Sequence, residues 1–387
     1  MAAPSFLPFI RGLVGISLSI AMLVPSLSAE TVAPPKVREP SVAGIFYPRD
    51  PAALAKEVSL LLGSVPPADP IVNLKAIVCP HAGYAYSGPV AARAYRQAAG
   101  GGFTTVVVLA PSHTAFLTEA SVSDARIFRT PLGDTAISER ARELAKLPPF
   151  SLEPKCQVQR PGWWQSSRKL APLPMDDRAD TWEHADEVQV PFIQIALPEA
   201  SVLPVIMGEV NPSDAARALS RVIDDKTLIV ASSDLSHFHP YEEARALDAK
   251  CIDAICRLDP AGIGEQSACG RVPIRTVIEL ARQRGWKAKL LDYRNSGDTA
   301  GDKSRVVGYA AIAFYAPSEK TAATPAVSEA HYTVEERRAL LSLARKALSS
   351  VVSTGRLPEP EASEAREKFQ PLKGCFVTLT KQGELRG

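Results

Sequence analysis

The chain has 387 residues, of which 46% are hydrophobic, and a formal net charge of +2. Its length and hydrophobic content suffice for a buried core, which excludes a disordered, collagen-like or coiled-coil chain. The balanced charge argues against a broad surface for nucleic acid and against a polybasic membrane patch. We therefore expect a globular protein of two or three domains.

The N-terminus has the layout of a secretory signal peptide. Arg11 is the only charged residue before Glu30, and residues 12–27 are apolar or small. Small residues follow at 26–29, and the apolar run is short for a membrane span. We expect a cleaved signal peptide over 1–29, export to a bacterial periplasm, and no membrane segment in the mature chain. An uncleaved anchor and a buried N-terminal helix are the alternatives.

Residues 30–38 are rich in proline and predict a linker. From 39 to 315, segments with strand and helix patterns alternate. Runs rich in β-branched residues, such as 104–110, are apolar on both faces, as in a buried parallel strand. The pattern predicts an α/β domain with a largely parallel or mixed sheet and helices on both faces. The expected strands are 75–79, 104–110, 202–207, 227–231, 287–293 and 307–315, and the expected helices are about 89–99, 136–146, 184–196, 213–223, 241–258 and 272–284.

Two segments do not follow this alternation. Residues 147–181 are rich in proline and serine, and we expect a long surface loop, either a lid or a mobile insertion.

After a small-residue linker at 316–330, a capping box at 333–336 predicts a helix over 334–350. A strand at 375–379 and a turn at 381–383 follow. We interpret 331–387 as a partial, truncated α+β domain.

Three polar motifs follow predicted strands. His81 lies in the first, His113 in the second, and Asp234 and His237 in the third. Because ligands bind beyond the carboxyl ends of strands in open α/β sheets, we expect these motifs to converge on one crevice. A single histidine after a strand is more often a hydrogen-bonding residue, but several in one crevice favour a metal.

Cys269 precedes the predicted helix 272–284, where the helix dipole is expected to lower the thiol pKa and favour the metal-binding thiolate. A buried structural cysteine is the alternative. The other cysteines are too sparse for a disulfide scaffold. At the start of helix 184–196, His184 and Glu187 are expected to share a face and to orient a ligand, or else to be a solvated helix start.

The motifs together resemble the Memo family: PHAGYAYSG (80–88), APSHT (110–114), FRTPLGD (128–134), EHADEVQVPF (183–192), SSDLSH (232–237), CGRVPI (269–274) and 295–315. The resemblance spans 39–315. The segment from Tyr332 resembles the opening of an AMMECR-type domain. The two families occur together in the AmmeMemoRadiSam system, which implies a functional link to a radical-SAM protein.

The resemblance implies a fold similar to class III extradiol dioxygenases. His81 and His113 then match the two histidine ligands of the metal, and Cys269 stands where the dioxygenases have a carboxylate. His237 matches the acid/base histidine, and Asp234 lines the same pocket. The remaining pocket or supporting residues are Tyr86, Ser112, Glu183, His184, Ser296 and Asp298.

A thiolate in place of a carboxylate makes the site softer, which favours copper, zinc or iron of altered potential and argues against an extradiol dioxygenase. We expect iron or copper ahead of zinc. Cys79, close to His81, could form a disulfide with Cys269 and destroy the site. Three functions stay open: a metal-dependent redox enzyme acting on a small molecule, a metal-handling protein without turnover, and a module that binds a peptide or phosphate group.

Overall fold

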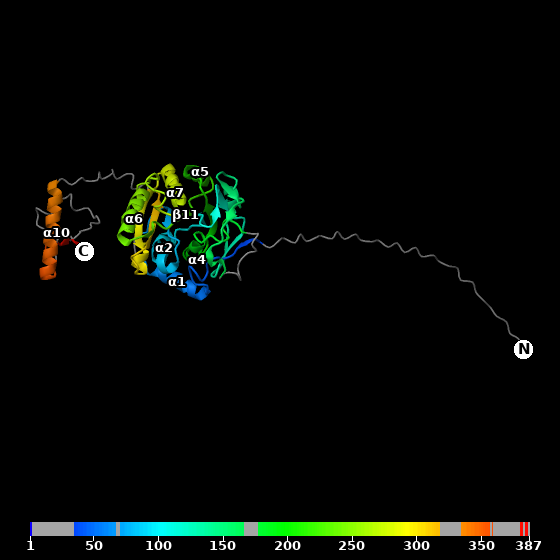
Figure 1. Ribbon diagram of the computed structural model, residues 1–387, viewed down its shortest axis with the longest axis horizontal. Helices are drawn as coiled ribbons and strands as arrows, with labels where there is room; N and C mark the ends of the chain where they lie inside the picture. Colours follow the sequence, from blue (N-terminus) through cyan, green and yellow to red (C-terminus); the bar gives the residue numbers. More distant parts are fainter. Residues whose placement is uncertain are drawn as a thin grey trace.

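The computed structural model describes Met1 and residues 35–66, 70–165, 177–317, 334–356, 358, 380–381 and 384–385. The signal peptide and most of the first linker lie outside these residues and stay predictions. In Figure 1, strands occupy the middle of the α/β domain and helices surround them. Among the described residues, no helix is both long and apolar enough to cross a membrane.

A mixed sheet of nine strands forms the centre of the fold. In spatial order its strands are β12 (His237–His239), β14 (Val306–Tyr315), β2 (Leu74–Cys79), β11 (Thr227–Ser232), β3 (Thr105–Pro111), β10 (Ser201–Met207), β5 (Ala120–Val122) and β8 (Phe150–Leu152), and β13 (Lys287–Asn295) pairs with β14. The four strands β2, β11, β3 and β10 run parallel. β14 and β5 run antiparallel to β2 and β10. The predicted fold class is confirmed.

Two smaller sheets flank the main one. One contains β1 (Val37–Arg38), β6 (Ile127–Thr130) and β7 (Gly133–Ala136), and the other contains β4 (Ala115–Phe116) and β9 (Gln157–Val158). β1 comprises the last two residues of the predicted linker 30–38. The N-terminal end of the domain is therefore part of the folded structure.

Helices cover both faces of the main sheet. They are α1 (Pro51–Gly63), α2 (Tyr84–Ala98), α3 (Arg140–Leu144), α4 (Val190–Ala196), α5 (Pro212–Leu219), α6 (Tyr241–Cys256), α7 (Arg271–Arg284) and α8 (Ser296–Thr299), with 3-10 helices η1 (Gly162–Gln165) and η2 (Glu187–Gln189). The chain moves across the sheet in one direction from β2 through α2 to β3, and in the other from β10 through α5 to β11. Because such crossovers are right-handed, α2 and α5 lie on opposite faces. Figure 1 shows α1, α2 and α4 together, and α5 beside α7.

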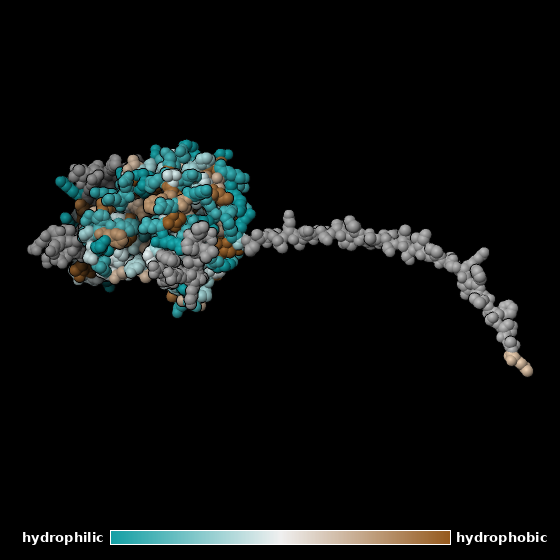
Figure 2. All heavy atoms as spheres, turned by 45° about the vertical axis from the view of Figure 1, so that its right-hand side comes forward, coloured by the Kyte–Doolittle hydropathy of each residue, from teal (hydrophilic) through white to brown (hydrophobic). Residues whose placement is uncertain are grey.

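One continuous hydrophobic core fills the space between the sheet and these helices. Figure 2 shows one face of the molecule, on which hydrophilic residues predominate and hydrophobic residues are scattered. This distribution is that of an ordinary folded domain with a polar surface.

Several predicted elements differ from the structure. The helix expected at 89–99 begins at Tyr84, whose backbone N–H donates to Phe46 O at 2.8 Å. The helix expected at 136–146 is reduced to α3, because Ala136 belongs to β7, and Ile137 and Ser138 pair with Val202 of β10. The helix expected at 184–196 is divided into η2 and α4. These changes come from contacts with distant segments.

The long surface loop expected at 147–181 was wrong in part. This segment contains β8, which pairs with β5 at the edge of the main sheet, together with β9 and η1. Phe150 of β8 is buried and fixes this edge strand to the core. Residues 166–176 lie outside the described residues.

Near the C-terminus, α10 spans Val334–Thr354, and β15 (Thr380–Lys381) pairs with β16 (Glu384–Leu385) in a short antiparallel hairpin. The helix predicted over 334–350 thus corresponds to α10. The strand predicted at 375–379 lies outside the described residues.

A buried ion pair attaches the start of the domain to the segment around η2. The Arg38 and Glu187 side chains are 1% and 0% exposed, and Arg38 Nη1 donates to Glu187 Oε2. The Glu187 carboxylate also accepts the Ser41 and Val42 N–H groups at 2.7 and 3.0 Å and the Tyr47 hydroxyl at 2.5 Å. Such a pair is held by its full set of partners, so the loss of one partner leaves a buried charge uncompensated.

Glu187→Ala should therefore lower the free energy of unfolding by about 3 kcal/mol, because buried Arg38 loses its nearest counter-ion and keeps Asp186, at 3.7 Å. Denaturation by urea measures the change. Glu139→Ala, which breaks the exposed pair with Arg126, is the matched control and should cost less than about 1 kcal/mol. Equal effects in the two variants would contradict the importance of the buried pair.

Candidate metal centre

The site lies where neighbouring parallel strands end. His81 follows β2 by two residues, His113 follows β3 by two residues, and Asp234 follows β11 by two residues. β11 lies between β2 and β3, so all three side chains emerge at the same edge of the sheet. Cys269 reaches this edge from the loop before α7.

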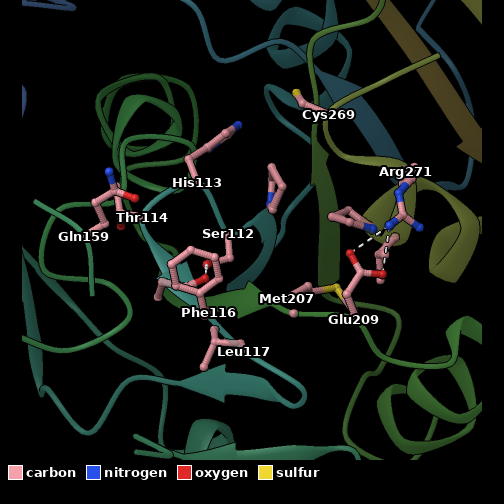
Figure 3. Close-up of a pocket in the computed structure, with 15 residues that line it drawn as sticks. Ser112, His113, Thr114, Phe116, Leu117, Gln159, Met207, Glu209, Cys269 and Arg271 are labelled. Atoms are coloured by element: carbon pink, nitrogen blue, oxygen red, sulfur yellow. Dashed lines mark hydrogen bonds and ion pairs between the residues drawn. The ribbon is translucent and has the colours of Figure 1, made fainter. Parts of the chain in front are cut away.

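Three potential ligands meet at this point. One ligand atom each from His81, His113 and Cys269 lies within 4.8 Å of the other two. His81 Nε2 is 3.1 Å from Cys269 Sγ, and the two imidazole rings meet edge to face at 5.2 Å between centroids. In Figure 3, the side chains of His113 and Cys269 point toward one another along one side of a cavity. The structure therefore brings together the three residues that the family resemblance implied.

The tautomer of His81 follows from its hydrogen bonds. Ser232 Oγ donates its single proton to Ala185 O at 2.6 Å and accepts from Gln189 Nε2 at 2.8 Å. It must therefore accept from His81 Nδ1, which lies 3.0 Å away. This leaves the Nε2 lone pair of His81 directed at Cys269, as a metal ligand requires.

Glu183 orients the other histidine. Its carboxylate, fully buried, accepts from His113 Nδ1 at 2.8 Å and from the His113 backbone N–H at 2.7 Å. Burial raises the pKa of Glu183, but His113 lowers it more, and the result is about 2. Burial lowers the pKa of His113, but Glu183 and then Cys269 raise it to about 11. Without a metal, His113 therefore holds a proton that a metal ion would replace.

A second group of potential ligands consists of His113, Glu183 and His184. Glu183 Oε1 already accepts from His113 Nδ1 and, at 3.0 Å each, from the His184 and Ala185 N–H groups. This oxygen has little capacity left for an ion, so Glu183 supports a ligand rather than being one. The His184 ring stacks on His113 at 4.6 Å, and burial lowers its pKa to about 4, which keeps it neutral.

The thiolate expected at Cys269 is contradicted for the metal-free protein. Burial raises the Cys269 pKa, and this effect exceeds the lowering by His113. The sulfur accepts the Asp234 N–H at 3.3 Å. The helix dipole is too weak to compensate for desolvation here, so the thiol is protonated until a metal displaces the proton. Cys79 and Cys269 are both free, and no disulfide joins them.

Asp234 and His237 occupy different positions around the three ligands. Asp234 Oδ1 accepts the His81 backbone N–H at 2.8 Å, and burial raises its pKa to about 7. His237 shares a cavity of about 240 Å³ with Cys269, and burial lowers its pKa, so the imidazole is neutral near pH 7. Asp234 therefore supports the His81 loop, while His237 faces space that a small molecule could enter.

The other predicted pocket residues are mostly engaged in local structure. Tyr86 is exposed on α2, and Ser112 lines a cavity while donating to Ala115 O at 2.6 Å. Ser296 accepts the Val307 N–H at 3.1 Å. Asp298 caps α8 and accepts the Tyr241 hydroxyl at 2.6 Å.

Some residues that support the site were not predicted. Ser232 and Gln189 fix the tautomer of His81, and Arg38 Nη2 donates to Glu183 O at 2.6 Å. Glu187 was expected to act beside His184, which was wrong: it binds Arg38, because the predicted helix begins there as a 3-10 turn. In the sequence, the one feature that pointed to Ser232 and Gln189 as site residues was their place inside the motifs SSDLSH and EHADEVQVPF.

Comparison with known proteins identifies the family of this chain. The family model described as Memo-like protein matches residues 38–313. A MEMO1 family protein of Desulfurococcus amylolyticus is 36% identical over 304 residues, covering 72% of this chain and 99% of its own. One from Methanothermobacter thermautotrophicus is 33% identical over 294 residues, with 71% and 99% covered. One from Aquifex aeolicus is 36% identical over 291 residues, with 72% and 99% covered.

Fold and site thus define a mixed α/β protein with a His/His/Cys cluster at the strand ends. The chain belongs to the Memo family.

Glu183→Gln should lower the pKa of His113 in the metal-free protein from about 11 towards or below 6.5, because it removes the charge that raises it. Nuclear magnetic resonance of the imidazole between pH 5 and pH 11 measures this pKa. A histidine pKa raised by folding adds stability that is complete below the unfolded value and is lost as pH rises through the folded value. The pair should therefore stabilise the wild-type protein most between about pH 4.5 and pH 6.5. It should stabilise the protein progressively less towards pH 11, as His113 loses its proton, and towards pH 2, as Glu183 gains one.

The control for this titration is Glu243→Gln, which removes the partner of the exposed His239 and should leave His113 unchanged. If the pKa of His113 is the same in Glu183→Gln as in the wild-type protein, the hydrogen bond between Glu183 and His113 does not raise this pKa.

Proposed function

We propose that this chain binds a transition metal through His81, His113 and Cys269 and carries out metal-dependent redox chemistry on a small molecule. The observation that supports this most is the approach of three ligand atoms from distant loops to within 4.8 Å of one another. Two imidazoles and one sulfur at such separations suit a single ion and leave further coordination positions open.

The chemistry of the donor atoms fits a metal. Nδ1 of His81 donates to Ser232 and Nδ1 of His113 donates to Glu183, which reserves the other nitrogen of each histidine for coordination. In a tetrahedral site, nitrogen and sulfur ligands of one ion lie about 3.6 Å apart. The 3.1 Å between His81 Nε2 and Cys269 Sγ is within a few tenths of an ångström of that separation. Copper, iron and zinc all accept these ligands, and redox chemistry selects iron or copper.

The residues around the ligands have separate roles in this proposal. A bound iron or copper ion would supply electron transfer and activation of a coordinated molecule. His237, neutral and facing the cavity that it shares with Cys269, accepts or returns a proton of the bound molecule. Asp234 and Glu183 hold the backbone of His81 and the imidazole of His113 in place.

Protein purified anaerobically should contain about one equivalent of iron or copper, and His81→Ala, His113→Ala and Cys269→Ala should each lose it. Ser232→Ala should keep the fold but bind metal about 10- to 100-fold more weakly, because His81 loses its orienting partner. Elemental analysis and competition with a chelator measure both effects.

The control for metal content is His239→Ala, a histidine outside the three-ligand cluster. Metal at background level in the wild-type protein, unchanged by His81→Ala, would contradict the proposal and favour a module that binds a peptide or phosphate group.

A second measurement separates redox turnover from metal handling. Metal-loaded protein should consume oxygen with a panel of small reducing substrates such as catechols, and His237→Ala should slow this uptake by about 100-fold or more without loss of metal. Oxygen uptake that is absent, or equal in both proteins, would instead favour storage or delivery of the metal.

A further inference from the structure

A second cavity of about 240 Å³ opens beside the proposed metal centre, on a different side from His237. His113 and Cys269 form part of its wall, and Figure 3 shows Arg271 paired with Glu209 across from His113. Pockets for drug-sized molecules occupy about 300–1,000 Å³, so this cavity suits a small molecule rather than a folded peptide.

Arg271 uses only one of its side-chain nitrogens to bind its partner, Glu209. A single nitrogen, Nη2, donates to both Glu209 oxygens, at 2.7 and 2.8 Å. This is not the two-nitrogen fork in which arginine binds a carboxylate most strongly. In the part of the chain that the structure describes, no other ion pair of Arg271 occurs. Glu209 is 71% exposed, so the pair adds little stability, and an incoming anion can replace Glu209 at low cost.

The backbone around Arg271 also favours an anion. Arg271 is the first residue of α7, and its N-cap, Gly270, supplies no side-chain hydrogen bond to the first turn. Pro273 has no N–H, and the Ile274 N–H already donates to Gly270 O. The N–H groups of Arg271 and Val272 therefore remain without an intrahelical acceptor, at the positive end of the dipole. Arg271 and the residues that follow it line the cavity.

The wall of the cavity opposite Arg271 contains Thr114, which is only 6% exposed and whose hydroxyl is buried in the protein. Phe116, Leu117 and Met207 provide apolar surface between the polar groups. Figure 3 places Thr114 on the side of the cavity opposite Arg271.

We propose that this cavity binds a small molecule that carries a carboxylate or phosphate group. The anionic group binds the Arg271 side chain and the N–H groups of Arg271 and Val272 in place of Glu209, and the rest of the ligand lies against Phe116, Leu117 and Met207. A ligand in this position lies against Cys269 and His113. The proposal rests on the proposed function in one respect. If the metal centre is active, small molecules that carry a carboxylate or phosphate group are its substrate class.

Calorimetric titration of the metal-free full chain with succinate and with inorganic phosphate tests the site, and the preferred probe identifies the type of anion. Arg271→Gln should weaken binding of that probe by about 10- to 100-fold, because a charge-assisted hydrogen bond is lost. Glu209→Gln should instead tighten it several-fold, because the competing carboxylate is removed. Arg282→Gln, an exposed arginine on the same helix, is the matched control and should change nothing.

Arg271→Gln and Glu209→Gln are expected to change the affinity for the anion in opposite directions. A purely structural ion pair would make both substitutions change it in the same direction. Absence of binding to the wild-type protein, or weakening by Glu209→Gln, would overturn the proposal, and the second result holds even if Arg271→Gln does not fold. Metal content is measured in parallel: wild-type protein with metal only at background level but with intact anion binding would refute the metal function and leave the anion site supported.

Discussion

The short segment Glu183–Gln189 is the constraint on which the candidate metal centre depends. Glu183 orients His113, and Gln189 orients Ser232, which in turn orients His81. Between them Glu187 is bound by Arg38 at the start of the domain. This segment therefore sets the orientation of the imidazoles of His81 and His113, and a buried ion pair holds the segment itself in place. Orientation through such outer partners determines how well histidines bind a metal.

This arrangement concentrates charge where burial is costly. Glu183, Asp186 and Glu187 are all buried within one segment, and Arg38 lies among them. Burial raises the pKa of Asp186 well above its ordinary value, although Arg38 lowers it. A core of apolar residues would be at least as stable in such a place. The buried polar cluster is better explained by the positions that it imposes on the ligands than by stability.

The fold and the ligand chemistry lead to different expectations about reactivity. The family resemblance implies a fold similar to that of dioxygenases, but it also implies that Cys269 stands where those enzymes have a carboxylate. Burial raises the pKa of its thiol, and the charge of Glu183 keeps the His113 imidazole beside it doubly protonated. A metal that binds there must displace the thiol proton and the Nε2 proton of His113, so its affinity falls as the pH falls. The anion cavity on the Arg271 side would then bring substrate charge close to a site whose own charge depends on the metal.

The sequence by itself determined the parallel strands, because runs of β-branched residues such as those of β3 and β11 suit only a buried sheet. It also indicated His81 and His113, which follow such strands. Only the tertiary structure decided the protonation of Cys269, the division of the helix expected at 184–196, and the roles of Ser232 and Arg38. These depend on contacts between residues far apart in the sequence: His81 and Cys269 differ by 188 in residue number, and Arg38 and Glu187 differ by 149. Local patterns carry no record of such contacts, since burial and hydrogen-bond partners arise only when distant segments pack together.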